Sequence, residues 1–168
     1  MRAIIKISIA VSLLMLFSCQ TKKAVEIDYM GQEPPGLKAE LFAPGIISTH
    51  LNEHSSLAFS PDGTVVLWAV MDSNYKGRLF EMKYANGAWS KPSSPSFADT
   101  TTDDYCPSFL VDGNKLIFSS RRKAMGYPEG RGNRIWSVER MADGWGTPSP
   151  FDTTVSKAQE FFFPTFHS

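Results

Sequence analysis

The chain has 168 residues, of which 42% are hydrophobic and 12% aromatic, which is enough apolar material for one domain of ordinary size. Its 17 Lys and Arg residues balance its 17 Asp and Glu residues, so the formal net charge is zero. This composition excludes disorder as the default state and gives no bulk attraction towards nucleic acid or anionic lipid. We therefore expect no nucleic-acid partner.

The N-terminus has the pattern of an export signal. Arg2 and Lys6 precede an apolar stretch at 7–17 that is too short for a permanent transmembrane helix. The letters LFSC at 16–19 resemble a bacterial lipobox, in which the Cys is acylated and becomes the first residue of the mature protein. The resemblance implies a signal peptide at 1–19 and a lipid anchor on Cys19, and hence a membrane-bound protein of the bacterial cell envelope. The alternative is an ordinary secretory signal with an incidental Cys.

Two short segments precede the main part of the chain. Residues 20–38 include the letters QEPPG and show neither strand nor helix periodicity, so they predict a flexible tether. Residues 39–44, AELFAP, are typical of an outer strand with no blade of its own. We expect that strand to complete a blade further along the chain.

Two similar units follow, each with an apolar run, an Asp-Gly turn and a second apolar run. The sequence LAFSPDGTVVLWAV at 57–70 corresponds to PSFLVDGNKLIFSS at 107–120. Asp-Gly between two apolar runs is a strong hairpin signal, because Gly accepts the positive φ that such turns need. A longer loop at 121–133 replaces the shorter one at 71–77, as expected for an exposed connection.

Each unit divides into four short strands, and no segment after the signal has helical spacing. We therefore predict an all-β chain. In the first unit the strands are expected at 55–60, 64–71, 78–84 and 89–97. In the second unit they are expected at 105–110, 114–120, 134–140 and 145–151.

Four-stranded antiparallel units of this length are typical of β-propeller blades. The letters FSPDG at 59–63, the later Leu-Trp pair and the trailing Gly-Trp-Pro pattern resemble the PD40 repeat, a WD40-like repeat of TolB-type periplasmic propellers. The resemblance implies a partial propeller at 39–168. Its blades are expected at about 53–102 and 103–159, with the start of a third at 160–168. An acidic residue that precedes the first strand in this family is matched by Glu53, Asp103 and Glu160.

Two blades with orphan strands would leave apolar faces and strand edges uncovered, which native chains avoid. We therefore interpret the sequence as an incomplete propeller, a shortened form of a longer gene product. The alternatives are several copies that close a ring head to tail, and a monomeric half-propeller.

Few side chains suggest chemistry. We interpret Cys106, which lies in a predicted strand, as a small buried apolar residue. The histidines have no spacing typical of a metal site, and they are His50, His54 and His167. Three carboxylates lack the glycine and the alternation of a calcium loop, so we predict a solvated turn plus the family's blade-joining acid at Asp99, Asp103 and Asp104.

The loop at 121–133, RRKAMGYPEGRGN, is the one stretch whose composition suggests a ligand. Arginine forks and an aromatic face suit anionic or sugar ligands. The candidate ligand residues are Arg121, Arg122, Tyr127 and Arg131. The alternative is that the loop has no specific ligand and that its arginines only keep an exposed loop well solvated.

The sequence contains no nucleophile elbow, phosphate-cradling glycine loop or paired carboxylates of a glycosidase, so we expect no catalytic residue and no cofactor. We expect a non-enzymatic envelope module that binds or scaffolds a protein or an envelope polymer, as the resemblance to TolB-type propellers implies. One alternative is the propeller of a larger hydrolase, such as a prolyl-oligopeptidase-like peptidase or a glycan-active enzyme. Another is a nonfunctional remnant.

Overall fold

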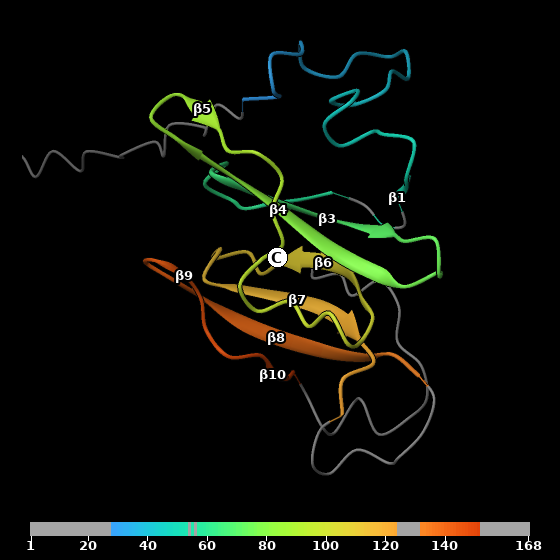
Figure 1. Cartoon of the computed structure of the whole chain (residues 1–168). Coiled ribbons are helices and arrows are strands. Elements are labelled where there is room, and N and C mark those ends of the chain that lie inside the picture. Colours follow the sequence, from blue (N-terminus) through green and yellow to red (C-terminus); the bar gives the residue numbers. More distant parts are fainter. Residues whose placement is uncertain (1–27, 54, 56, 124–131, 152–168) are drawn as a thin grey trace, which may run out of the picture.

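The computed structural model describes residues 28–53, 55, 57–123 and 132–151. In this part of the chain the protein is all-β, with ten short strands in two antiparallel sheets stacked face to face (Figure 1). The expected signal peptide, with Cys19, and the expected start of a third blade at 160–168 lie outside the described residues. So do Tyr127 and Arg131, and also His54, Glu160 and His167.

The first sheet is one propeller-like blade, centred on the paired strands β3 and β4. Strands β1 and β2 both pair with the other side of β3, and β5 pairs with the end of β4. An isolated bridge between Glu81 and Ser93 continues the outer edge beyond β5. The strands are β1 (Asn52–Glu53), β2 (Ala58–Phe59), β3 (Val65–Met71), β4 (Gly77–Ala85) and β5 (Ala88–Trp89).

The second sheet repeats this plan, with β6, β7 and β8 in sequence order and two short outer strands, β9 and β10, paired with β8. Ser149 pairs with Ser137 in β10 and β8, as Ser93 pairs with Glu81 in the first blade. The strands are β6 (Asp104–Phe109), β7 (Lys115–Ser120), β8 (Arg134–Met141), β9 (Gly144–Trp145) and β10 (Ser149–Pro150). The expected order of four strands in each unit is confirmed, but some strands are shorter than expected. In the first blade the inner strand expected at 55–60 forms only as β2, beside a separate β1, and the outer strand forms as β5 and the bridge at Ser93. In the second blade the outer strand forms as β9 and β10.

The turns explain why the hairpins form where the sequence predicts them. Gly63 and Gly113 adopt φ values of 68° and 72°, which residues with a Cβ rarely reach. Asp62 accepts from the backbone N–H of Thr64 at 3.1 Å, and Asp112 accepts from that of Asn114 at 3.0 Å. Each Asp-Gly pair therefore closes its turn in the same way.

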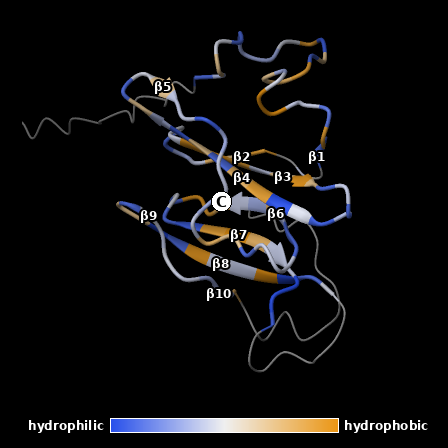
Figure 2. Ribbon diagram, in the orientation of Figure 1, coloured by the Kyte–Doolittle hydropathy of each residue, from blue (hydrophilic) through white to orange (hydrophobic). Residues whose placement is uncertain are grey.

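The main hydrophobic core lies between the two blades. Hydrophobic residues run along β3, β4, β7 and β8, as Figure 2 shows. Side chains from both sheets and from the connection between them meet in this core. Its buried members are Val65, Leu67, Ala69, Leu79, Phe97, Leu116, Phe118, Trp136 and Val138. The two blades cover one face of each other, and the arrangement is that of an incomplete propeller.

Polar contacts join the blades at the edge that carries the hairpin turns. Arg140 in β8 contacts Asp62 Oδ2 and Thr64 Oγ1, each at 2.8 Å. Trp145 donates its Nε1–H to Glu81 Oε2 at 2.8 Å. These bonds fix the blades in register at one end of the shared core.

The other face of the first blade is covered by residues 28–50, which we call the cap. Ala43 and Ile47 are buried against Trp68 in β3, and Phe42 packs beside them. The expected outer strand at 39–44 is wrong, because Pro44 makes only an isolated bridge with Ser48. Turns replace the strand, since burying these apolar side chains on an open blade face stabilises more than pairing at an edge.

The described part of the expected tether begins on the blade. The carbonyl of Asp28 accepts a hydrogen bond from Trp89 Nε1 at 3.1 Å. Tyr29 packs edge-on against Phe42, with ring centroids 6.4 Å apart. Residues 33–41 then run exposed before the chain returns to the blade at Phe42.

Candidate functional site

The predicted ligand loop leaves the second blade at one edge of its sheet. Ser120 ends β7 and lies, in the strand register, between Asp104 at the start of β6 and Arg134 at the start of β8. The chain that connects Ser120 to Arg134 therefore begins and ends at this edge. We call residues 99–104, 120–123 and 133–134 the loop edge.

Arg121 is the exposed cation at the root of the loop. Its Nη1 lies 3.1 Å from Asp103 Oδ2, and its Nε donates to Asn133 Oδ1 at 3.2 Å. Asp103 and Asn133 are buried, whereas the Arg121 side chain is 53% exposed. A rigid base thus orients the guanidinium, and its outer part faces solvent.

Arg122 points the other way, into the blade. Its Nη2 lies 2.6 Å from Asp104 Oδ2 and donates to the carbonyl of Phe97 at 2.8 Å. The guanidinium carbon lies 5.1 Å from the ring centroid of Phe118, and the side chain is only 10% exposed. Of the two candidate ligand arginines that the structure describes, Arg122 therefore makes its contacts inside the blade, whereas Arg121 faces solvent.

Asp104 is the buried partner of this pair. Burial raises the pKa of the Asp104 carboxyl above its usual value, although hydrogen bonds from Arg122 and Ser120 act in the opposite direction. Removing a carboxylate from water is costly unless it is paired, and Arg122 supplies the countercharge. The Asp104–Arg122 pair is thus an internal structural contact.

The expected solvated turn at 99–104 is only partly present. Asp99 accepts from the N–H and Oγ1 of Thr101 at 2.8 and 2.6 Å, and these bonds lower the pKa of Asp99. Asp103 and Asp104 are instead 8% and 2% exposed, so a solvated position is wrong for Asp104. Asp103, which is predicted as the family's blade-joining acid, bonds to Arg121 in its own blade. Among the described residues, no three His, Cys, Asp or Glu side chains gather to hold a metal ion.

The first blade has a charged pair at the same edge. Arg78 at the start of β4 donates through Nη1 to the carbonyl of Thr102 at 2.9 Å, and its Nε lies 3.5 Å from Asp72 Oδ2. Arg78 corresponds to Arg134, which begins β8 in the second blade. The contact with Thr102 ties the first blade to the loop edge of the second.

Three further predicted residues lie elsewhere in the blades and the cap. Cys106 is 4% exposed and lies in β6, so its interpretation as a buried apolar residue is confirmed. Its φ of 49° coincides with a register shift between Tyr105 and Ser108, which marks a β-bulge. His50 is exposed. Glu53 accepts from the N–H of Thr49 at 2.9 Å.

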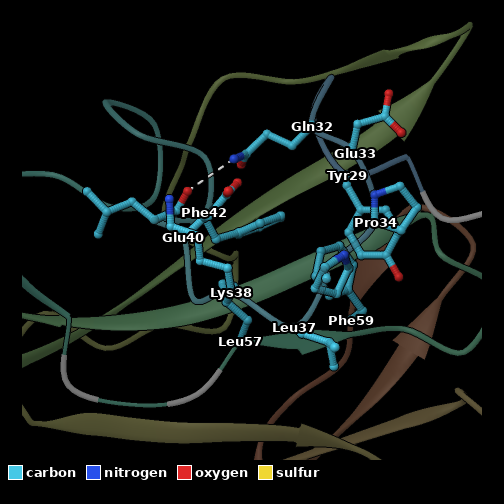
Figure 3. Close-up of a pocket in the computed structure, with 13 residues that line it drawn as sticks. Tyr29, Gln32, Glu33, Pro34, Leu37, Lys38, Glu40, Phe42, Leu57 and Phe59 are labelled. Carbon is cyan, nitrogen blue, oxygen red and sulfur yellow. Dashed lines mark hydrogen bonds between the residues drawn. The ribbon is translucent and has the colours of Figure 1, made fainter.

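The structure also contains a groove that the sequence reasoning missed. Its volume is about 600 Å³, and it lies between the cap and β2 (Figure 3). Tyr29, Phe42, Leu57 and Phe59 form its apolar wall, and residues 32–41 form its outer side. Tyr29 and Phe42, at the ends of the segment 29–42, are aromatic, which could have suggested an apolar wall. The groove forms only because these two residues, distant in the sequence, contact each other.

Comparison with known proteins found no family model and no curated protein that matches this chain. The described residues contain no helix long and apolar enough to pass through a bilayer.

Proposed function

We propose that this protein is a lipid-anchored β-propeller module of the bacterial cell envelope that binds a protein or an envelope polymer. The sequence supports the anchor, because a charged n-region and an apolar stretch lead to the letters LFSC that end at Cys19. The fold supports the module, because two stacked blades form a rigid platform with a loop at one edge.

The observation that carries the proposal is the fixed, half-exposed guanidinium of Arg121. Two buried groups, Asp103 and Asn133, hold it at the root of the connection between β7 and β8. A pre-oriented guanidinium binds carboxylate or phosphate with little loss of side-chain entropy. Anionic groups of this kind occur on envelope polymers and on acidic protein surfaces, so we infer a ligand with exposed anionic groups.

The anchor is tested by metabolic labelling with palmitate, followed by separation of membranes. The full chain should carry label and sediment with membranes. The Cys19→Ala variant should lose both properties, because several acyl chains on one Cys provide the stable anchoring. Label retained by Cys19→Ala would remove the lipid anchor from the proposal.

The binding surface is tested by co-sedimentation with purified peptidoglycan sacculi, an anionic sugar polymer. We expect Arg121→Ala to weaken retention about tenfold, the effect of losing one charged hydrogen bond. Lys91→Ala is the matched control, because Lys91 is an exposed cation away from the loop edge. Equal retention of the two variants would exclude the loop edge as the contact.

A further inference from the structure

Residues 33–41 form a loop that is closed at its base by one side chain. Gln32 donates through Nε2 to the carbonyl of Leu41 at 3.0 Å, and its Oε1 accepts from the N–H of Ala43. These bonds join points nine and eleven residues apart in the chain. Compact loops whose ends lie close together are frequently functional, so we call residues 33–41 the cap loop.

The base of the cap loop rests on the first blade. Tyr29 and Phe42 flank the loop and contact each other edge-on. Phe42 in turn lies 6.1 Å from Phe59, and Phe59 lies 6.2 Å from Trp89, measured between ring centroids. This row of aromatic rings connects the loop to the blade, so the loop has a fixed place on the molecule.

Two leucine side chains of the cap loop are uncovered, one at its tip and one at its base. Leu37, at the middle of the loop, is 111% exposed, and Leu41 is 71% exposed. Both line the groove that Figure 3 shows in close-up. Pro34 and Pro35 restrict the backbone before the tip. The protein thus maintains two large apolar side chains in solvent on a loop of limited freedom.

The predicted anchor places this loop near a bilayer. Cys19 precedes Asp28 by nine residues, and a chain of that length spans at most roughly 32 Å. The loop itself carries Glu33, Lys38 and Glu40, so its net charge is negative. Attraction to anionic headgroups therefore cannot hold it at a membrane, and any contact must come from burial of apolar surface.

We propose that the cap loop is a membrane-contact loop, which inserts Leu37 and Leu41 into the boundary between the headgroups and acyl chains of the bilayer. The inference rests on the proposed anchor at Cys19, which holds the loop at high local concentration near the lipid. Contact at a second point, apart from the acyl chains, would fix the orientation of the blades above the membrane. The loop edge would then face its ligand at a set height and angle.

The experiment uses an environment-sensitive fluorophore on a single introduced thiol. Leu37→Cys and Leu41→Cys are labelled in the full chain, in which Cys106 is buried and Cys19 is acylated. Val111→Cys is the matched control, because Val111 is also apolar and 65% exposed but lies in the β6–β7 turn of the second blade. The labelled proteins are reconstituted with phosphatidylcholine vesicles that contain a nitroxide-labelled lipid.

We expect a blue shift and quenching several-fold stronger at positions 37 and 41 than at position 111. Adding anionic phosphatidylglycerol should not increase the effect, because the loop is net negative. Equal quenching at all three positions overturns the inference, as does a signal that requires anionic lipid and disappears in high salt. A blue shift at position 37 without vesicles also overturns it, since the tip would then be covered by protein.

The two proposals fail in different ways. A parent chain that takes up no palmitate label would contradict the anchor. A palmitate-labelled, membrane-bound protein with water-like fluorescence at position 37 would contradict only the membrane-contact loop. The Cys19→Ala chain with the fluorophore at position 37 provides a second measurement. With vesicles in excess it should still show the blue shift, at a higher lipid concentration than the anchored chain, and no shift at any lipid concentration contradicts the inference.

Discussion

At the scale of single residues, the loop edge has two kinds of charge. The ion pair of Arg122 and Asp104 is buried and structural, whereas Arg121 is exposed. Arg122→Ala leaves Asp104 in the interior without a countercharge and also removes the contact with Phe118. Removing one partner of a buried pair typically costs about 3 to 5 kcal/mol, and we expect about 3 kcal/mol here because Ser120 still donates to Asp104. Urea denaturation measures this loss.

Arg121→Ala is the control for this change. The Arg121 side chain is 53% exposed, so water can partly replace its contact with the buried Asp103, and we expect a smaller loss of about 1 kcal/mol. The double variant Asp104→Leu/Arg122→Met should be more stable than Arg122→Ala, since it leaves no buried charge. Equal stability of Arg122→Ala and Arg121→Ala would mean that the buried contacts of Arg122 do not stabilise the blade.

Gly77 is required at its position because an aromatic ring occupies the space of a side chain. A Cβ on Gly77 would lie 2.0 Å from Tyr105 Cε1, far inside contact distance. Gly77 starts β4 in the first blade and Tyr105 lies in β6 of the second, so the contact joins the blades. Gly77→Ala should destabilise by about 2 kcal/mol, as overpacking does, and thermal unfolding measures it.

Tyr105→Ala should relieve this clash. The double variant Gly77→Ala/Tyr105→Ala should therefore be more stable than the sum of the two single changes predicts. Additive effects would show that the ring and the glycine are not in contact.

At the scale of elements, the cap replaces a packing partner on the first blade. Ile47 is 4% exposed against this face, whereas the adjacent Ile46 is 41% exposed. Ile47→Ala should cost about 3 kcal/mol and increase cleavage of the cap by a protease, because a cavity opens beneath it. Ile46→Ala, which removes the same atoms, should stay within about 0.5 kcal/mol of the parent. Equal effects of the two substitutions would mean that the cap does not pack on this face of the first blade.

Sequence periodicity predicted the central strands of each blade well, because their signals are local. The expected strand at 114–120 forms at Lys115–Ser120, where an Asp-Gly turn precedes a continuous apolar run. The cap could not be predicted in the same way. The letters AELFAP have the same local pattern whether they pair at an edge or pack on a face, and the open face of the first blade decides between the two.

The same distinction explains the loop edge. Asp104 lies in a polar run, so its sequence context indicates solvent. Its partner Arg122 is 18 residues away in the chain, and Arg122 also binds the carbonyl of Phe97, which is 25 residues before Arg122. Burial of a carboxylate depends on that distant guanidinium. Arg121 and Arg122 are neighbours of identical type, and only the alternation of side chains at the end of β7 turns one outward and the other inward.

At the scale of the whole molecule, Asp62 makes the folded state sensitive to acid, because it bonds to Ser60 and Thr64 in its own turn and to Arg140 in the other blade. Burial raises the pKa of Asp62, but hydrogen bonds from Ser60, Thr64 and Arg140 outweigh it and lower that pKa from 3.8 to about 2. A carboxyl whose pKa is lower in the folded state than in the unfolded state stabilises the folded state at pH values above its unfolded-state pKa. This stability is therefore present above pH 3.8 and is lost as the pH falls through about 2.

The pH dependence of Asp104 has the opposite sign. Burial raises the pKa of its carboxyl, so its contribution to stability is lost as the pH rises through the raised pKa. Comparing the parent with Asp62→Asn separates the contribution of the Asp62 charge from that of Asp104. The parent should have the higher melting temperature at neutral pH, and the difference should shrink between pH 4 and pH 2. Because the Asp62 side chain is 51% exposed, we expect at most about 1 kcal/mol, reduced by salt. A difference that persists unchanged at pH 2 would mean that the Asp62 charge does not stabilise the folded state.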